Sequence, residues 1–285
     1  KGFVYKMLRK KRIKLNGSRA EGGEMLAEGD RIQMYLSDET IGGFREEKRI
    51  NRSASPLSVI YEDENIIVAD KPAGTLSHAE SPDDRDTLID RVLSFLNEKG
   101  EYDPGRENSF VPALCNRLDR NTSGIVIAGK TAEALRQLNE AVKNKDIKKY
   151  YLALVCGKME NGGRLEDFYE KDGSLNKAKI GGKTGKRIAT VYSPVKTAEG
   201  YSLAEAELIT GKSHQIRAHL ASAGFPIIGD VKYGIKADND RFRKTAGVKR
   251  QMLHAYRLRL GGLSGELAYL NGKEFRSDVP EDFKR

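Results

Sequence analysis

Short apolar runs typical of β-strands recur along most of this chain and outnumber its helical segments. We expect strands at residues 57–61, 66–70, 124–128, 149–156, 187–197, 201–209 and 252–260. Helical patterns cover residues 86–99, residues 131–145 with a cap at Thr131, and a segment that Ser213 caps and that ends before Gly224. Because strands and helices do not alternate regularly, a doubly wound parallel sheet is disfavoured. The sequence predicts an α+β fold in which helices flank a mixed, largely antiparallel sheet.

The net charge of +9 comes almost entirely from the first 20 residues. They contain eight basic side chains and no acidic one, whereas the rest of the chain has 42 basic against 41 acidic residues. A concentrated basic patch attracts phosphates because binding releases their counterions. A solvated basic tail is the alternative, but Phe3, Val4, Met7 and Leu8 recur at helical spacing and favour an amphipathic helix. The basic residues here that we expect to contact nucleic acid are Lys10, Lys11, Arg12 and Lys14.

A change in composition separates this basic segment from the rest of the chain. An Asn16-Gly17 turn follows residues 13–15, and a strand-like run covers residues 31–36. Residues 44–56 are polar and aperiodic, which is typical of a linker. We therefore expect a small amino-terminal module at residues 1–43, this linker, and a large domain at residues 57–285.

Composition disfavours several classes of protein. No apolar run reaches the roughly 18 residues of a membrane helix, and no signal-peptide core lies near the start. Lys1 in place of Met indicates that the native beginning is missing. Cys115 and Cys156 form no Cys-x-x-Cys pair, so we expect no zinc and a reduced, cytoplasmic environment. The chain has no Gly-x-Gly-x-x-Gly, Walker loop or clustered metal ligands, so we expect no cofactor and no metal.

The segment from Cys115 to Gly124 carries the most chemical information. It places Asp119 between Arg117 and Arg120, and nearby cations lower the pKa of a carboxyl group and keep it ionised. An ionised aspartate can act as a nucleophile at an electrophilic carbon. An aspartate between two arginines is, however, more often part of a surface ion pair. Two later segments bear on the choice between a nucleophile and a surface ion pair. They are Lys149-Tyr150-Tyr151 and Gly211 to Leu220.

The three segments together resemble the RluA/RluC family of RNA pseudouridine synthases. Residues 117–124 match that family's Arg-Leu-Asp-x-x-Thr-Ser-Gly signature, and residues 149–151 fit its Lys-x-Tyr strand. Residues 211–220 fit its Gly-Arg-Thr-His-Gln-Ile-Arg-x-His-Leu helix. Further agreement is found at residues 71–74, 226–230, 233–234 and 253–255. The resemblance spans about residues 57–262, which is most of the chain.

The resemblance implies three catalytic residues. Asp119 would be the nucleophile, attacking either C1′ or C6 of a uridine, and Arg217 would form a salt bridge with it. Tyr151 would stack on the uracil and act as a base or hydrogen-bond partner near the C5 proton. The side chains that we expect to contact RNA in this domain are Arg117, Arg120, His78 and Lys212.

The chain departs from the family pattern at two places. Asn116 stands where the family usually has histidine, and either residue could hydrogen-bond nearby backbone. Lys212-Ser213 replaces Arg-Thr, which keeps the charge but loses a bidentate phosphate donor.

We therefore expect an RNA pseudouridine synthase. The basic segment at residues 1–43 resembles the later part of an S4 RNA-binding module, without that module's opening helix. Within the family such a module favours large-subunit ribosomal RNA, or a pre-ribosomal particle, as the substrate. The alternatives are a transfer-RNA pseudouridine synthase and a non-catalytic RNA-binding factor for ribosome assembly. A monomer without metal, cofactor or membrane contact is the expectation for the whole protein.

Overall fold

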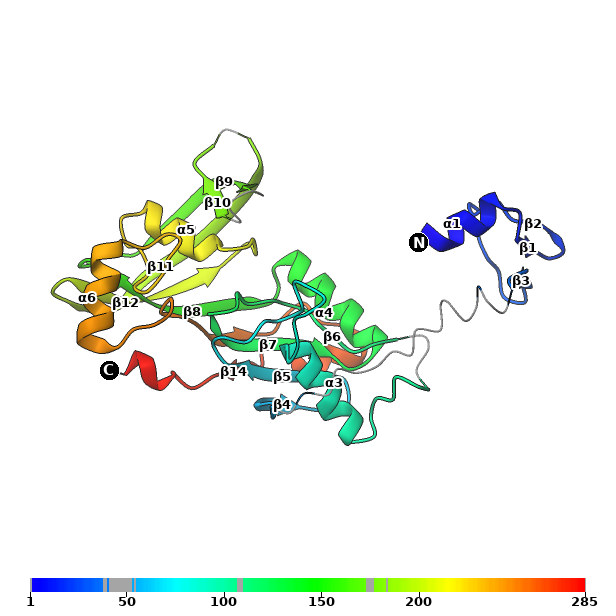
Figure 1. Ribbon diagram of the computed structural model, residues 1–285, viewed down its shortest axis with the longest axis horizontal. Helices are drawn as coiled ribbons and strands as arrows, with labels where there is room; N and C mark the ends of the chain where they lie inside the picture. The colour runs from blue at the N-terminus through cyan, green and yellow to red at the C-terminus, as the bar shows by residue number, and fades with distance from the viewer. Residues whose placement is uncertain are drawn as a thin grey trace. The chain divides into compact units, whose positions relative to one another are not determined.

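The computed structural model describes residues 2–37, 40, 53, 55–106, 110–172, 177–182 and 184–284. The chain divides into two compact units, Lys1–Arg49 and Ile50–Arg285 (Figure 1). Most of the expected linker at residues 44–56 lies outside the described residues. The two units are considered separately below.

The first unit is a short helix packed on a three-stranded sheet. Helix α1 (Gly2–Arg9) precedes β1 (Ile13–Leu15), β2 (Ser18–Arg19) and β3 (Ile32–Met34), which pair in the order β2-β1-β3. The Asn16-Gly17 turn joins β1 to β2 with φ angles of 49° and 82°, which suits a tight hairpin. We expected this turn to lead to the run at 31–36, but that run pairs with the other edge of β1. Val4 also differs from the expectation, because its side chain is exposed while Met7 and Leu8 are buried.

The second unit is built on one large sheet. Its strands are β4 (Val59–Glu62), β5 (Ile66–Lys71), β6 (Ala113–Leu114), β7 (Ser123–Gly129), β8 (Lys148–Cys156), β9 (Gly163–Asp172), β10 (Lys177–Ile180), β11 (Lys186–Ala198), β12 (Tyr201–Leu208), β13 (Leu253–Arg259) and β14 (Glu274–Arg276). They pair in the order β10-β9-β11-β12-β8-β13-β7-β5-β4, with β14 beside β13 and β6 beside β7. Among the described strands, β7 and β13 form the one parallel pair. The expected α+β fold with a largely antiparallel sheet is confirmed.

Both faces of this sheet are covered because its central strands are apolar on both sides. Along β7, Val126 belongs to one buried cluster and Ile125 and Ile127 to another, as the alternation of side chains along a strand requires. Helices α3 (Leu88–Glu98) and α5 (Gln215–Ser222) contribute to the first cluster. Helix α4 (Ala132–Asn144) and the 3₁₀ helix η1 (Gly265–Leu270) contribute to the second.

Some helix ends differ from the sequence-based expectation. Thr131 caps α4 as expected, accepting a hydrogen bond from the Ala134 backbone N–H at 3.1 Å. The predicted Ser213 cap is wrong, because the residue before α5 is His214, with φ 57° and no side-chain cap. Helix α3 starts two residues later than predicted, behind a capping box formed by Thr87 and Asp90.

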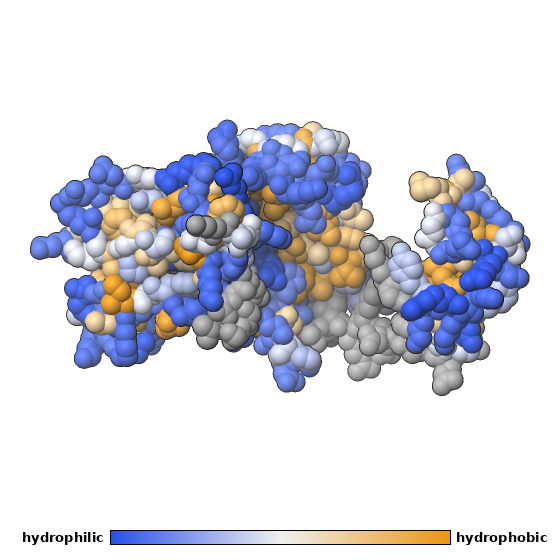
Figure 2. Space-filling model, turned by 90° about the horizontal axis from the view of Figure 1, so that it is seen from above, coloured by the Kyte–Doolittle hydropathy of each residue, from blue (hydrophilic) through white to orange (hydrophobic). Residues whose placement is uncertain are grey.

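The sequence did not predict several elements of the sheet domain. Strands β9 and β10 form a hairpin beside α5 (Figure 1), and helix α6 (Lys236–Ala246) follows later in the chain. The 3₁₀ helix η2 (Glu281–Phe283) lies near the carboxyl end. The surface seen in Figure 2 is largely hydrophilic, with smaller apolar areas. Among the described residues, no helix is long and apolar enough to span a membrane.

Candidate active site

Asp119 lies in the loop between β6 and β7, where hydrogen bonds fix the backbone on both sides. The Ser77 hydroxyl accepts a hydrogen bond from the Leu118 N–H at 3.0 Å and lies 2.9 Å from the Leu118 carbonyl oxygen. The Thr122 N–H donates to the Asp119 carbonyl at 3.0 Å, which closes a turn. The carboxylate of Asp119 remains 27% exposed. The loop is therefore held rigidly while its carboxylate stays accessible.

Lys71 also stabilises this loop through hydrogen bonds from its ammonium group. Its side chain is fully buried, and its ammonium donates to the carbonyls of Pro72, Thr75 and Arg120 at 3.1, 2.6 and 3.1 Å. Burial lowers the pKa of Lys71 to about 7, against the opposing effect of the Asp119 charge. Gly74 N–H donates to the same Arg120 carbonyl at 2.9 Å. The residue that follows Asp119 is thus anchored to the end of β5.

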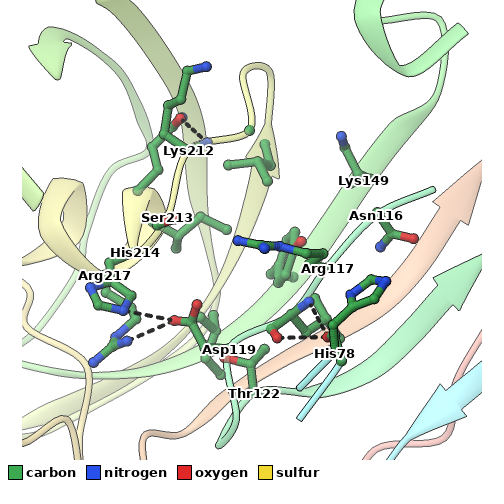
Figure 3. A pocket seen from close by; sticks show the side chains of 18 of the residues that line it. His78, Asn116, Arg117, Asp119, Thr122, Lys149, Lys212, Ser213, His214 and Arg217 are labelled. Carbon is green, nitrogen blue, oxygen red and sulfur yellow. Dashed lines mark hydrogen bonds and ion pairs between the residues drawn. The ribbon is translucent and has the colours of Figure 1, made fainter. Parts of the chain in front are cut away.

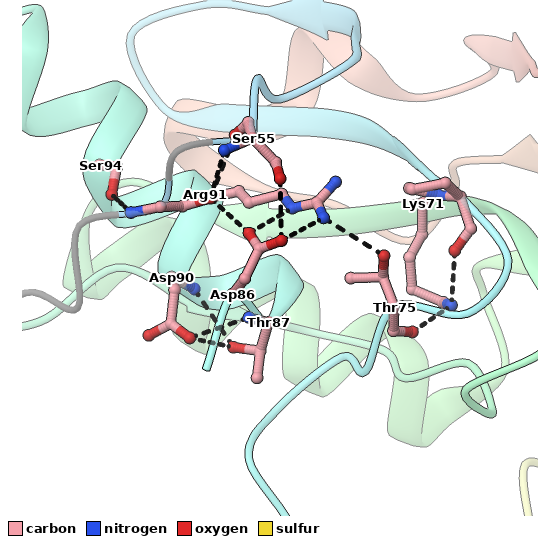
Figure 4. A network of polar contacts seen from close by, with 10 residues as sticks. Ser55, Lys71, Thr75, Asp86, Thr87, Asp90, Arg91 and Ser94 are labelled. Atoms are coloured by element: carbon pink, nitrogen blue, oxygen red, sulfur yellow. Dashed lines mark hydrogen bonds and ion pairs between the residues drawn. The ribbon is translucent and has the colours of Figure 1, made fainter. Parts of the chain in front are cut away.

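A polar network at the start of α3 extends this anchor (Figure 4). Arg91 forms a bidentate pair with Asp86, at 2.9 and 2.8 Å, and its Nη2 lies 3.4 Å from the Thr75 hydroxyl. The Arg91 guanidinium holds the pKa of Asp86 at about 2. The hydroxyls of Ser53 and Ser55 also donate to Asp86. The end of the predicted linker is therefore tied to the segment that supports the Asp119 loop.

Arg217, on α5, connects Asp119 to a second carboxylate. Its Nη1 lies 2.7 Å from Asp119 Oδ2, and its Nε and Nη2 donate to the two oxygens of Asp230 at 2.7 and 2.9 Å. Asp230 is fully buried and also accepts the backbone N–H groups of Lys232 and Tyr233. The guanidinium holds the pKa of Asp230 below its usual range despite burial, which acts in the opposite direction. Arg217 is therefore oriented by Asp230 and presents one N–H to Asp119.

Tyr233 and His214 complete the surroundings of Arg217. The Arg217 guanidinium lies over the Tyr233 ring, 5.2 Å from its centroid. The Tyr233 hydroxyl is 3.0 Å from His214 Nδ1 and accepts the Ala178 N–H of β10 at 2.6 Å. His214 Nε2 lies 3.9 Å from Asp119 Oδ2, and burial lowers the pKa of this imidazole. The β9–β10 hairpin is thus linked to the site through one phenol.

Tyr151 lies on the central strand β8 in the same pocket as Asp119. Its side chain is buried within the apolar cluster on the α3 and α5 face of the sheet. Burial, with a smaller contribution from the negative charge of Asp119, raises the pKa of Tyr151 far above its usual value. The phenol is therefore neutral at physiological pH, and its ring forms part of the pocket wall.

The pocket has a volume of about 840 Å³ and brings together most of the residues predicted for the site (Figure 3). Its wall includes all three predicted catalytic residues and three of the predicted RNA-binding residues: Asp119, Tyr151, Arg217, Arg117, His78 and Lys212. Burial, followed by the charge of Arg117, lowers the pKa of His78, so that imidazole is neutral at physiological pH. Within the described part of the chain, no group of three or more His, Cys, Asp or Glu side chains could hold a metal ion.

Other predicted RNA-binding residues lie outside this pocket. The Arg120 side chain is exposed and lies 3.7 Å from Asp84. Lys10, Lys11 and Arg12 are exposed at the turn between α1 and β1 in the first unit, and Lys14 lies on β1, 5.4 Å from the centre of the Tyr35 ring.

Sequence reasoning missed the supporting residues of the site. Asp230 and Lys71 were noticed as parts of motifs but were given no role, because their partners lie elsewhere in the chain. Asn116, which stands in place of the family's histidine, hydrogen-bonds the backbone of β7, accepting from Ile127 N–H at 2.9 Å. A polar residue inside an otherwise apolar, motif-rich stretch is the signal that could have pointed to Asp230.

The sequence profile of the RNA pseudouridylate synthase family matches residues 65–222. The chain is 32% identical to an uncharacterized RNA pseudouridine synthase of Mycoplasma pneumoniae, over 96% of this chain and 86% of that protein. It is also 32% identical to the ribosomal large subunit pseudouridine synthase D of Borreliella burgdorferi, over 88% of this chain and 74% of that protein. A similar protein from Vibrio vulnificus, ribosomal large subunit pseudouridine synthase C, is 30% identical over 91% of this chain and 79% of its own length.

The fold also resembles solved structures. Human RNA pseudouridylate synthase domain containing 4 superposes with a TM-score of 0.61 over 80% of this chain and 90% of its own, at 21% identity. At this identity the likeness concerns the fold alone.

Proposed function

Because the chain belongs to the RNA pseudouridylate synthase family, we propose that it isomerises uridines of large-subunit ribosomal RNA with Asp119 as the nucleophile. The observation that carries this proposal is the position of Asp119. Its accessible carboxylate lies at the wall of a pocket of about 840 Å³, paired at 2.7 Å with an arginine that a second, buried carboxylate orients. A carboxylate that served only in a surface ion pair would not require such support.

Pseudouridine formation breaks the N1–C1′ bond of a uridine and makes a C5–C1′ bond, with no net oxidation or reduction. Asp119 attacks C1′ or C6 of a uridine that has left its stack and entered the pocket. Arg217 compensates the negative charge of the attacking carboxylate and fixes its direction. The bond between Asp119 and the nucleotide is broken again, so the carboxylate is regenerated. After the new carbon–carbon bond forms, C5 loses its proton and N1, now free of the sugar, carries one, so the overall change is an isomerisation.

Tyr151 acts as a neutral phenol in this mechanism. Since its pKa is far above the usual value, a phenolate base is disfavoured at physiological pH. The ring provides an apolar surface for the uracil, and the hydroxyl is a hydrogen-bond partner next to the reacting carbons. Tyr150, the preceding residue on β8, carries the Arg257 guanidinium 3.8 Å from the centre of its ring, and so packs against a different part of the structure.

We propose that the first unit, with the partial S4-like module at residues 1–43, supplies much of the RNA affinity. Its exposed lysines and arginines at the α1–β1 turn suit phosphate contacts of the kind that carry no sequence information. Arg117 and Lys212 extend this role to the pocket, with His78 beside Arg117. Support for ribosomal RNA comes from the names of the relatives in B. burgdorferi and V. vulnificus.

Pseudouridine mapping tests the substrate. Ribosomal and transfer RNA from cells lacking the protein would be mapped before and after treatment with the purified enzyme. We expect sites in large-subunit RNA to disappear in these cells and to return with the wild type. Restoration of transfer-RNA sites alone would contradict the ribosomal assignment and leave the chemistry in place.

A further inference from the structure

Lys149 is a cation in the pocket whose charge the fold leaves uncompensated among the described residues. It lies on β8 two residues before Tyr151, so both side chains project from the same face of the strand. Its Nζ reaches the loop before α5, where a Cβ built on Gly211 would lie 3.9 Å from it. Figure 3 shows Lys149 at the opposite end of the pocket from Asp119, with Arg117 between them.

Two lysines of this unit that are buried more deeply have partners for their ammonium groups. Lys71 donates to three backbone carbonyls. Lys130 pairs with Glu62 at 3.0 Å, contacts Glu101, and donates to the Asp63 carbonyl at 2.7 Å. The Lys149 ammonium has no hydrogen bond or ion pair with any residue that the structure describes. Because an ammonium group is costly to remove even partly from water without a partner, the half-buried Lys149 calls for an explanation.

The surroundings of Lys149 favour an anionic ligand. The acidic side chains on the pocket wall are Glu80 and Asp119, and Asp119 is already paired with Arg217. Arg117 and Lys212 on the same wall, like Lys149, have no carboxylate within ion-pair distance among the described residues. Burial lowers the pKa of Lys149, and no neighbouring charge counteracts this effect. A bound anion would stabilise the charged form and supply the missing acceptor.

We propose that the Lys149 ammonium binds a non-bridging oxygen of the phosphodiester next to the target uridine. This inference rests on the proposed function, since it assumes RNA in this pocket. A phosphodiester fits better than a uracil carbonyl for two reasons. It carries the negative charge that a partly buried ammonium lacks, and Lys149 lies away from Asp119, where the reacting sugar and base must be. The nucleotide's backbone then runs from Asp119 past Arg117 towards Lys149.

Replacement by methionine separates this role from a structural one. Lys149→Met keeps the length of the side chain and removes a charge that is costly to bury, so the melting temperature should be equal to or higher than that of the wild type. Affinity for a stem-loop RNA that contains the mapped uridine should fall about 10- to 100-fold, the usual range for a lost charged hydrogen bond. Lys149→Arg should recover part of this loss. Lys148→Met is the matched control, because Lys148 is exposed on the other face of β8 and should bind normally.

A methylphosphonate, which is uncharged, identifies the group that Lys149 contacts. The stem-loop would be made with one methylphosphonate on the 5′ or 3′ side of the uridine, and affinities measured in an Asp119→Asn background so that the RNA is not converted. We expect one of the two methylphosphonates to weaken binding by the protein that retains Lys149. The same methylphosphonate should cause no further loss when Lys149 has been replaced by methionine. Independent losses at both positions, or normal binding by Lys149→Met, would overturn the phosphate contact. If binding showed this dependence but the wild type formed no pseudouridine, the proposed chemistry would fail while the contact stood.

Discussion

The guanidinium of Arg217 is shared between two carboxylates that differ in exposure. Asp230 is fully buried and takes two of its N–H groups, while Asp119 is 27% exposed and takes one. A buried guanidinium needs its partners, and removing one of them leaves charge uncompensated. Asp230 therefore acts as a positioning residue for the arginine that pairs with the proposed nucleophile.

Replacing Asp230 should lower both stability and turnover. We expect Asp230→Ala to reduce the free energy of unfolding by about 3 kcal/mol, because it breaks a buried ion pair. The turnover number should fall as well, since Arg217 loses its orientation. Asp240→Ala is the control: Asp240 is paired with exposed Lys236 on α6, and its removal should leave the urea midpoint nearly unchanged. Equal midpoints for the two variants would contradict this role of Asp230.

The sequence led to Asp119 more directly than to its partners. The residues around Asp119 are contiguous, so a local motif carries them. Arg217 lies 98 residues away, and its pairing with Asp119 was expected from family resemblance alone. Asp230 and Lys149 were missed for a physical reason: the roles of both depend on what surrounds the side chain in space, which no local pattern encodes.

At the scale of elements, Gly124 shows why the motif ends in glycine. It lies on β7 with φ 111°, directly opposite Ala255 of the parallel strand β13. A Cβ at this position would lie 2.2 Å from the Ala255 carbonyl oxygen. The Cβ would be attached to the backbone of β7, and the oxygen belongs to the backbone of β13. Because the two strands are paired, neither atom can move away without separating them. The close approach of β7 and β13 holds the loop of Asp119 against the sheet.

Gly124→Ala should therefore be more harmful than an ordinary glycine replacement. We expect it to cost at least about 3 kcal/mol of stability, from overpacking together with backbone strain. Gly200→Ala is the matched control: Gly200 also has a positive φ, 83°, but nothing lies within 4 Å of the added Cβ, and strain alone should cost about 1–2 kcal/mol. Thermal unfolding of both variants measures the difference. A smaller loss for Gly124→Ala than for Gly200→Ala would contradict the argument.

Elements were predictable where burial imposed a pattern. Helix α4 alternates buried residues such as Leu138 with exposed ones behind a Thr131 cap, and its predicted range agrees closely with Ala132–Asn144. Strands β5 and β7 are buried on both faces and stand out as apolar runs. Strand β9 has the sequence GRLEDFYEKD, and helix α6 has no buried residue. Because these two elements bury so little apolar surface, their sequences show no clear periodicity of apolar residues.

At the scale of the whole molecule, the net positive charge is concentrated in the first of the two units. The first 20 residues carry eight basic and no acidic side chains, while the remainder is nearly balanced. Under the proposed function, general attraction to RNA resides mainly in the first unit and the chemistry in the second. Losing the basic turn should therefore affect binding more than the chemical step.

Neutralising Lys10, Lys11 and Arg12 together tests this division. Replacing all three by glutamine should weaken RNA binding and reduce the slope of log affinity against log salt by roughly 2, since fewer phosphate contacts release fewer counterions. The turnover number at saturating RNA should remain that of the wild type. The charge-conserving triple variant Lys10→Arg, Lys11→Arg and Arg12→Lys should bind normally. An unchanged salt slope in the glutamine variant would show that this turn does not contact phosphates.

The role of Asp119 as the nucleophile is tested most directly by the turnover of Asp119→Asn. The variant keeps the shape of the side chain, and Arg217 retains both hydrogen bonds to Asp230, so the fold and the RNA affinity should be close to those of the wild type. Asp84→Asn, which changes a loop carboxylate 3.7 Å from Arg120, serves as the control and should remain active. We predict that Asp119→Asn binds the RNA but forms no pseudouridine above background. Appreciable pseudouridine formation by this folded variant would contradict the assignment of Asp119 as the nucleophile.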